Sequence, residues 1–160
     1  MRGETLDLVL SYALWDSPTK FLGVFSRDLI PLTCNSYPSA FVANTDPSSL
    51  PGRHWVAFYH ISPTHLEFFD SYDHHTEDYK FSTSPSLSLL DYNSLHMQSI
   101  RSSDCAQYCI FFLIHRTLGI LMPEIISTLR SPTNPDLFIR IFGAKYRTHM
   151  NQSFNNSFSC

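Results

Sequence analysis

Cys105 opens the apolar run Cys105-Ala-Gln-Tyr-Cys109-Ile-Phe-Phe-Leu, and Asp104 before it is a residue type that caps helices. A thiol at the start of a helix ionises easily, because the unpaired N–H groups and the helix dipole stabilise a thiolate. A thiolate that shares its proton with a histidine is a nucleophile for acyl transfer. Position alone leaves a second interpretation open, in which Cys105 is a small buried hydrophobic residue.

A histidine and a carboxylate upstream of Cys105 are predicted to be neighbours. Residues 54–60 and 65–70 are rich in β-forming side chains, and the turn Ile61-Ser-Pro-Thr64 separates the two runs. An antiparallel hairpin brings the start of its first strand and the end of its second strand to the same end of the sheet. His54 and Asp70 therefore meet, although each alone is an ordinary strand-edge residue.

The remaining pattern predicts a single domain over residues 1–150, with a flexible polar tail over 151–160. A short amphipathic helix is expected over 4–14, a strand over 41–44 and another short strand near 95–100. The residues that follow Cys105 are apolar on all sides, which is typical of a buried central helix ending near Leu118. Asn134-Pro135-Asp136 combines a cap, a proline and an acid, so it predicts the start of a further helix.

Composition excludes several classes of protein. The 160 residues carry a formal charge of −3, which gives no general electrostatic reason to bind nucleic acid. The basic residues Arg140, Lys145, Arg147 and His149 gather late in the chain, as a basic patch or as a solvated helix face. Four scattered cysteines, no signal peptide and no apolar run long enough to span a membrane predict a soluble intracellular protein in a reducing compartment.

Taken together, these motifs and their spacings resemble those of the adenain-like cysteine peptidases. These are maturation proteases of adenoviruses and of virus-like mobile DNA elements, and they share a fold with the proteases that process ubiquitin-like proteins. Between Gln98 and Cys105 the spacing is Gln-x6-Cys, as in that family. The other matching segments are Phe21-Leu-Gly-Val-Phe25, Arg27-Asp-Leu-Ile-Pro31, Gly52-Arg-His54-Trp55-Val-Ala-Phe58, Leu66-Glu-Phe-Phe-Asp70-Ser-Tyr72 and Cys109-Ile-Phe-Phe-Leu113.

The resemblance implies an α+β, papain-like fold in which a central, mostly antiparallel sheet packs against the buried helix that carries Cys105. It implies that Cys105 is the nucleophile, His54 the base and Asp70 the residue that orients the imidazole. Gln98 and the backbone N–H of Cys105 would form the oxyanion hole. Trp55 would pack over the substrate cleft, or serve only in strand packing.

The resemblance also implies a monomer that needs no metal or organic cofactor and cleaves protein substrates after small or Gly-rich sites. Its substrates would be capsid or core precursors, in the host nucleus or the virion. Adenain is stimulated by a viral peptide and by DNA, but residues 82–94 contain no cysteine to bond such a peptide. Ala106 stands where the family usually has glycine, and the chain after Cys105 is shorter than in adenain.

Three other functions remain open at this stage. The chain could be a deubiquitinase or ubiquitin-like-protein protease, which cuts after a similar Gly-rich segment. It could be an inactive protease-fold interaction module, although all four expected positions carry competent side chains. A zinc site is disfavoured, because His60, His65, His74 and His75 lack the paired spacing of tight zinc sites.

Overall fold

The computed structural model describes the backbone of residues 1–157 and the side chains of residues 1–152. The helices are α1 (Gly3–Ala13), the short 3-10 helix η1 (Arg27–Leu29), α2 (Cys105–Thr117), α3 (Met122–Arg130) and α4 (Pro135–Ser157). The strands are β1 (Lys20–Phe25), β2 (Ser39–Asn44), β3 (Trp55–Ser62), β4 (His65–Phe69) and β5 (Leu89–Tyr92).

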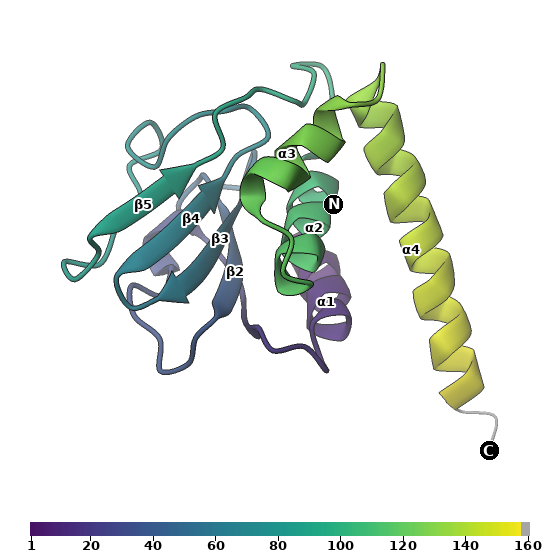
Figure 1. Cartoon of the computed structure of the whole chain (residues 1–160), viewed down its shortest axis with the longest axis horizontal. Helices are drawn as coiled ribbons and strands as arrows, with labels where there is room; N and C mark the ends of the chain where they lie inside the picture. The colour runs from purple at the N-terminus through teal and green to yellow at the C-terminus, as the bar shows by residue number, and fades with distance from the viewer. Residues whose placement is uncertain (158–160) are drawn as a thin grey trace.

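The five strands form one sheet in the order β1-β2-β3-β4-β5 (Figure 1). The central strands β2, β3 and β4 pair antiparallel, while β1 and β5 pair parallel to their neighbours at the two edges. The predicted hairpin is present as β3 and β4, with Ala57 opposite Phe69. The predicted α+β fold with a sheet against the Cys105 helix is therefore confirmed.

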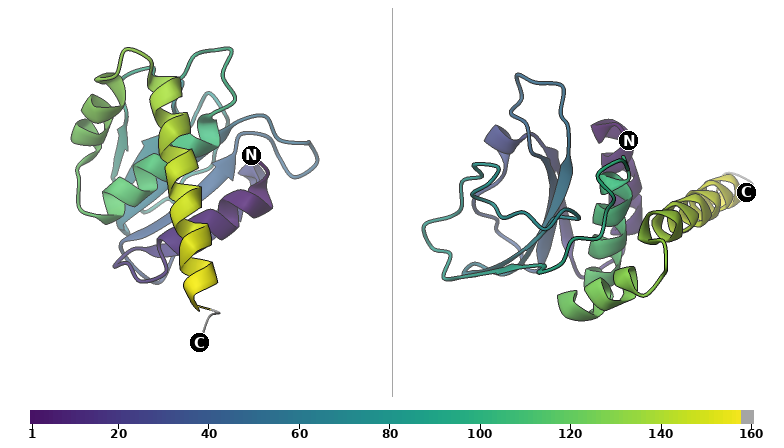
Figure 2. Two further views of the ribbon diagram at one scale, coloured as in Figure 1. Left: turned by 90° about the vertical axis from the view of Figure 1, so that its right-hand side faces the viewer. Right: turned by 90° about the horizontal axis from the view of Figure 1, so that it is seen from above.

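The two faces of the sheet are covered differently (Figure 2). All four α-helices lie on one side, and loops with η1 cover the other. The larger core lies between α1, α2, α3, α4 and the sheet, and it includes Ala57, Phe69 and Phe112, with Phe69 and Phe112 stacked at 4.5 Å. A smaller core of aromatic side chains around Phe58 and Phe68 lies under the loops. Alternate residues of β3 and β4 thus feed two cores, as the two-residue period of a strand requires.

A buried ion pair fixes α2 on the sheet. Arg116 in α2 donates to the carboxylate of Glu67 in β4 at 2.6 and 3.2 Å, and both side chains are less than a tenth exposed. The guanidinium also lies 4.6 Å from the centre of the Tyr59 ring in β3. Because Arg116 is three turns after Cys105 on the same helix, this contact helps to set the position of the Cys105 end.

We expect Glu67→Ala to destabilise the fold strongly, because it leaves the Arg116 charge buried without its partner. Loss of one member of a buried pair costs about 3–5 kcal/mol. The free energy of unfolding in urea measures this loss. Asp46→Ala is the matched control, since it leaves the Arg53 guanidinium without its carboxylate, but that side chain is 82% exposed and stays in water. An equal fall in the urea midpoint for both variants would contradict the role assigned to Glu67.

One expectation about the chain after β4 needs correction, and one helix was not expected. The strand predicted near 95–100 is wrong: the last strand is β5, over 89–92. Instead of joining a ladder, Met97 and Gln98 donate their backbone N–H groups to the carbonyl of Ser71, each at 3.0 Å. The sequence pattern did not predict α3, which begins at Met122 and has Pro123 as its second residue.

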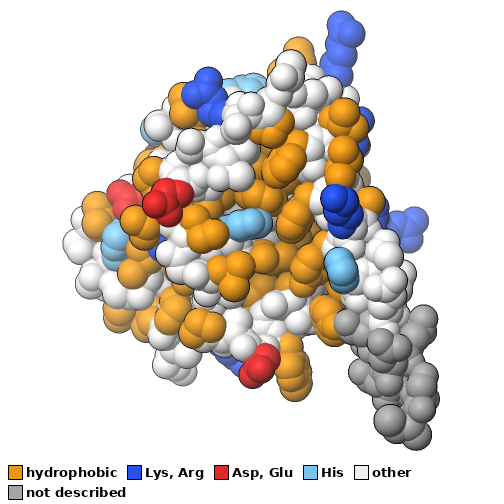
Figure 3. All heavy atoms as spheres, turned by 45° about the vertical axis from the view of Figure 1, so that its right-hand side comes forward, with side chains coloured by type: hydrophobic (Ala, Val, Ile, Leu, Met, Phe, Trp, Pro, Cys, Tyr) orange, Lys and Arg blue, Asp and Glu red, His pale blue; other side chains and the backbone are white. Residues whose placement is uncertain are grey.

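The helix α4 is long and leaves the body of the protein toward its C-terminal end (Figure 1). The predicted tail from residue 151 coincides with its last turns, and residues 158–160 lie outside the described part of the chain. On the face where α4 leaves the body, hydrophobic side chains outnumber charged ones (Figure 3). Among the described residues, no helix has the length and apolar character needed to cross a membrane.

Candidate active site

His54 lies immediately before β3, at the end of a loop that a single side chain organises. The Oδ1 atom of Asn44 accepts hydrogen bonds from the backbone N–H groups of Asp46 and Arg53, at 2.9 and 3.2 Å. Gly52 has a φ of +87°, and a Cβ at this position would lie 2.7 Å from the Asn44 amide nitrogen. Only glycine fits at position 52, and this tight turn against Asn44 fixes the path of the chain that leads to His54.

Asp70 follows β4 directly and is completely buried. Its Oδ1 atom lies 2.6 Å from Nε2 of His54 and accepts the backbone N–H of Tyr72 at 2.9 Å. The Asn93 side chain accepts from the N–H of Asp70 at 2.8 Å and donates to its carbonyl at 2.7 Å. Burial alone would raise the pKa of Asp70, but the hydrogen bonds from His54, Tyr72 and Tyr79 lower it below the ordinary value. Asp70 is therefore a carboxylate.

Cys105 is the first residue of α2, and its thiol lies within the electrostatic reach of the His54 ring. Burial opposes ionisation of the thiol, but His54 and the backbone N–H groups of Trp55 and Ala106 lower the pKa of Cys105 below its ordinary value.

The imidazole of His54 interacts with both the Asp70 carboxylate and the Cys105 thiol. Burial opposes a positive charge on the ring, but hydrogen bonds with Asp70 and Cys105 raise the pKa of His54 to about 9. Because the pKa of the thiol is lowered and that of the imidazole is raised, the thiolate and imidazolium pair is favoured over the neutral thiol and imidazole near pH 7. The geometry thus supplies an activated nucleophile, and the ring holds a proton for a leaving group.

Gln98 is buried at the base of the same site. Its Oε1 atom accepts from the Ser71 hydroxyl at 2.6 Å, and its Nε2 atom donates to the carbonyl of Ser102 at 2.9 Å. These two bonds fix which end of the amide is the donor, and one Nε2 hydrogen remains for a ligand. The structure brings Gln98 to the cleft that contains His54 and Cys105.

An open cleft of about 740 Å³ lies over these residues. Trp55 and Tyr72 line it, and the Tyr72 ring stacks on the His54 ring with 4.6 Å between their centres. The Trp55 indole also donates to the carbonyl of Met1 at 3.2 Å, so this side chain both lines the cleft and anchors the start of the chain. Both roles considered for Trp55 are compatible with this geometry.

Ala106 and the other cysteines have clear positions. Ala106 is helical and completely buried, and it is not among the residues with a positive φ, so glycine is not needed there. Cys109 is buried one turn further along α2, where burial raises its pKa well above the ordinary value. Cys34 is partly exposed near Ser39. Cys160 lies outside the described residues.

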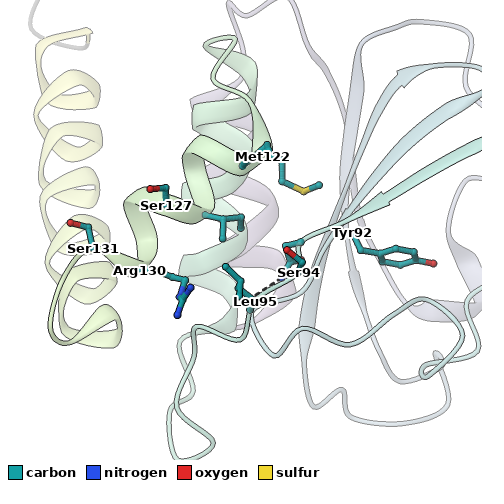
Figure 4. Close-up of a pocket in the computed structure, with 10 residues that line it drawn as sticks. Tyr92, Ser94, Leu95, Met122, Ser127, Arg130 and Ser131 are labelled. Atoms are coloured by element: carbon teal, nitrogen blue, oxygen red, sulfur yellow. Dashed lines mark hydrogen bonds between the residues drawn. The ribbon is translucent and has the colours of Figure 1, made fainter.

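A second hollow, of about 510 Å³, lies between α3 and the chain that follows β5 (Figure 4). Leu95 and Arg130 lie beside each other there, and Met122 points toward the strands. This hollow contains no thiol, imidazole or carboxylate, so it cannot by itself support acyl transfer. In the described part of the chain, no group of three or more histidine, cysteine or acidic residues has the geometry of a metal site.

The fold is similar to that of two solved structures. The ASFV pS273R protease has a TM-score of 0.52 and 17% identity, over 80% of this chain and 62% of that chain. The central domain of the uncharacterized Lpg1148 protein from Legionella pneumophila has a TM-score of 0.53 and 15% identity, over 92% of this chain and 97% of that domain. No protein-family model matches the sequence, and no curated protein matches it either.

The chain therefore has the fold of this viral cysteine protease, and the match spans about 62% of that protein's length. At this level of identity the likeness establishes the fold, while the adenain-like specificity expected from the motifs stays a prediction.

Sequence reasoning missed the residues that support the site. Tyr79 and Asn93 both bind Asp70, although they lie nine and twenty-three residues after it. Ser71 orients Gln98 from the residue next to Asp70. Tyr72 ends the Leu66–Tyr72 motif, but the motif assigns it no role, and in the structure its ring stacks on that of His54. No spacing or composition signal marks Tyr79 or Asn93, because both follow from how the loops fold back onto β4.

Proposed function

We propose that this chain is a cysteine endopeptidase with Cys105 as nucleophile, His54 as general base and acid, and Asp70 as the orienting carboxylate. The observation that carries the proposal is the position of the His54 ring. Its Nε2 atom lies 2.6 Å from a fully buried carboxylate, and the ring interacts with a helix-terminal thiol that lines the same open cleft.

In this mechanism the Cys105 sulfur adds to the scissile carbonyl carbon, and the negative charge passes to the carbonyl oxygen. Gln98 Nε2 and the N–H of Cys105 would stabilise that oxygen. His54 then gives its proton to the leaving amine, which departs as the acyl group stays on sulfur. Water hydrolyses the thioester with His54 as base, and the thiolate and imidazolium are restored.

For the substrate we propose structural precursor proteins of a virus or virus-like element, cut after small or Gly-rich segments. Two observations support this choice: the motifs resemble those of adenain-like peptidases, and the fold is that of the ASFV pS273R protease. On this proposal the protein works in the host nucleus or in the virion. Ubiquitin-like proteins, which also end in Gly-rich segments, are the alternative substrate class.

A peptide library with Gly-Gly, Gly-Ala and bulky residues before the scissile bond tests the proposal, with products identified by mass spectrometry. Cleavage after the Gly-containing members by the native chain, and none by Cys105→Ala, is the expected result. Electrophilic ubiquitin-type probes are run in parallel, and strong labelling of Cys105 by them would favour the alternative substrates. A chain that cleaves neither peptides nor such proteins, with Cys105 unreactive, would be an inactive interaction module.

A further inference from the structure

The loop after Asp70 folds back over that residue instead of extending into solvent. Asp73 and Lys80 reverse the chain with φ values of 64° and 60°. Arg27 donates to the carbonyl of Tyr79 at 3.0 Å, which ties the loop to η1. As a result, His74 and Tyr79 lie against the second oxygen of the Asp70 carboxylate, opposite to the one that contacts His54.

The contacts on this second oxygen, Oδ2, form a chain. The hydroxyl of Tyr79 donates to Oδ2 of Asp70 at 2.8 Å. The Nδ1 atom of His74 lies 2.7 Å from the same hydroxyl oxygen and 3.5 Å from Oδ2. Because the Tyr79 hydroxyl has one hydrogen and gives it to Asp70, Nδ1 of His74 must donate to the Tyr79 oxygen.

Hydrogen bonds therefore run from His74 to Tyr79 and from Tyr79 to Oδ2 of Asp70, whose Oδ1 atom accepts from His54. The bond from His74 polarises the Tyr79 hydroxyl and so makes it a better donor to Asp70. Without Tyr79, the remaining close contact on Oδ2 is the backbone N–H of His74 at 3.2 Å. The carboxylate would then be less firmly held and its negative charge less stabilised.

We propose that Tyr79 is a positioning residue for the Cys105 and His54 pair, acting through Asp70, and that His74 fixes the direction of the Tyr79 hydroxyl. This inference rests on the proposed peptidase function. It adds a residue that holds Asp70 in place and that is not among His54, Asp70, Gln98 and Cys105. Tyr79 does not line the cleft, so its influence falls on the reacting groups and not on substrate binding.

Tyr79→Phe is the test, because it removes the hydroxyl and keeps the ring against Phe81 and His54. We expect kcat to fall about tenfold, as for loss of a hydrogen bond to a charged group, with KM unchanged. Loss of one donor raises the pKa of Asp70, so the carboxylate takes up a proton at a higher pH, and a protonated Asp70 no longer holds the His54 imidazolium beside the Cys105 thiolate. The acid limb of the pH profile should therefore move to higher pH, both for cleavage and for alkylation of Cys105 by iodoacetamide.

Tyr92→Phe is the matched control. The Tyr92 hydroxyl bonds Thr76 and Glu77 in the same loop but makes no contact with Asp70. This variant should keep the native profile, whereas His74→Ala should move it in the same direction as Tyr79→Phe but less. Thermal unfolding checks that all three variants remain folded.

The alkylation readout separates this inference from the function beneath it. If the native chain shows no His54-dependent reaction of Cys105 at low pH and cleaves no peptide, the proposed function itself fails. If that reaction is present and Tyr79→Phe leaves its pH profile unchanged, only the role of Tyr79 is overturned. A uniform loss of rate at every pH, or an equal shift in Tyr92→Phe, would also overturn it, since either would indicate general loosening of the loop.

Discussion

Replacing His54 by alanine is expected to lower kcat by at least about 10⁴-fold, and Cys105→Ala to abolish cleavage completely. Cys105→Ala removes the atom that forms the acyl bond, so no residual covalent route exists. His54→Ala leaves the thiol in place but removes both its proton acceptor and the positive charge beside it. A continuous assay on a Gly-containing peptide measures both effects.

The pH dependence of alkylation gives the same prediction without a substrate. In the native chain His54 lowers the pKa of Cys105, so the thiolate should react at a lower pH than an ordinary thiol does. In His54→Ala the burial that opposes ionisation of Cys105 remains, but the His54 interaction that favoured the thiolate is lost. The pKa of Cys105 therefore rises. Alkylation at pH 5–6 should therefore disappear, and the cleavage profile of the native chain should fall above about 9 as His54 loses its proton.

His65→Ala is the matched control for this experiment. The His65 ring lies 2.7 Å from the carboxylate of Asp91, so it forms a histidine and aspartate pair like that of His54, but at a partly exposed edge of the sheet. Cys34 and the fully buried Cys109 serve as internal thiols in the same mass spectrum. Retained low-pH reactivity of Cys105 in His54→Ala, or its loss in His65→Ala, would contradict the assigned pair.

The meeting of His54 and Asp70 was predictable because it depends on a local hairpin. Two β-forming runs with a four-residue turn allow little choice of pairing, and antiparallel pairing brings the start of the first run to the end of the second. The start of α2 at Cys105 was predictable for a similar reason, since the apolar run begins at that residue. Both predictions depend only on residues that are close together in the sequence, so the local pattern of residue types is enough to make them.

The strand β5 and the support of Gln98 were not predictable in this way. Residues 89–92 pair parallel to β4 across a long loop, so nothing next to them in the sequence marks their partner. The segment near 95–100 has β-forming residues, yet its N–H groups bond Ser71, and this irregular path carries Gln98 under the cleft. Asn93 holds Asp70 from the same region through contacts twenty-three residues apart. Such contacts depend on the finished fold and leave no local signature.

Gln98→Ala is expected to lower kcat about 10²- to 10³-fold with KM nearly unchanged, as for loss of one oxyanion-hole donor. Its free Nε2 hydrogen would bond the carbonyl oxygen only after charge develops there, so the effect belongs to the transition state. Ser71→Ala should cost less, since it removes only the 2.6 Å bond that fixes the amide orientation. Steady-state kinetics on one peptide compares the two variants.

Alkylation by iodoacetamide separates this role from a general disturbance of the site. That reaction displaces iodide from a saturated carbon and forms no oxyanion, so Gln98→Ala should alkylate Cys105 with the native rate and pH profile. Gln107→Ala is the matched control, because Gln107 lies on α2 against Gly143 of α4 and does not line the cleft, and its Oε1 atom has no partner among the described residues. If Gln98→Ala instead slowed alkylation as much as cleavage, Gln98 would be holding the nucleophile in place, and the oxyanion would depend on the helix N-terminus alone.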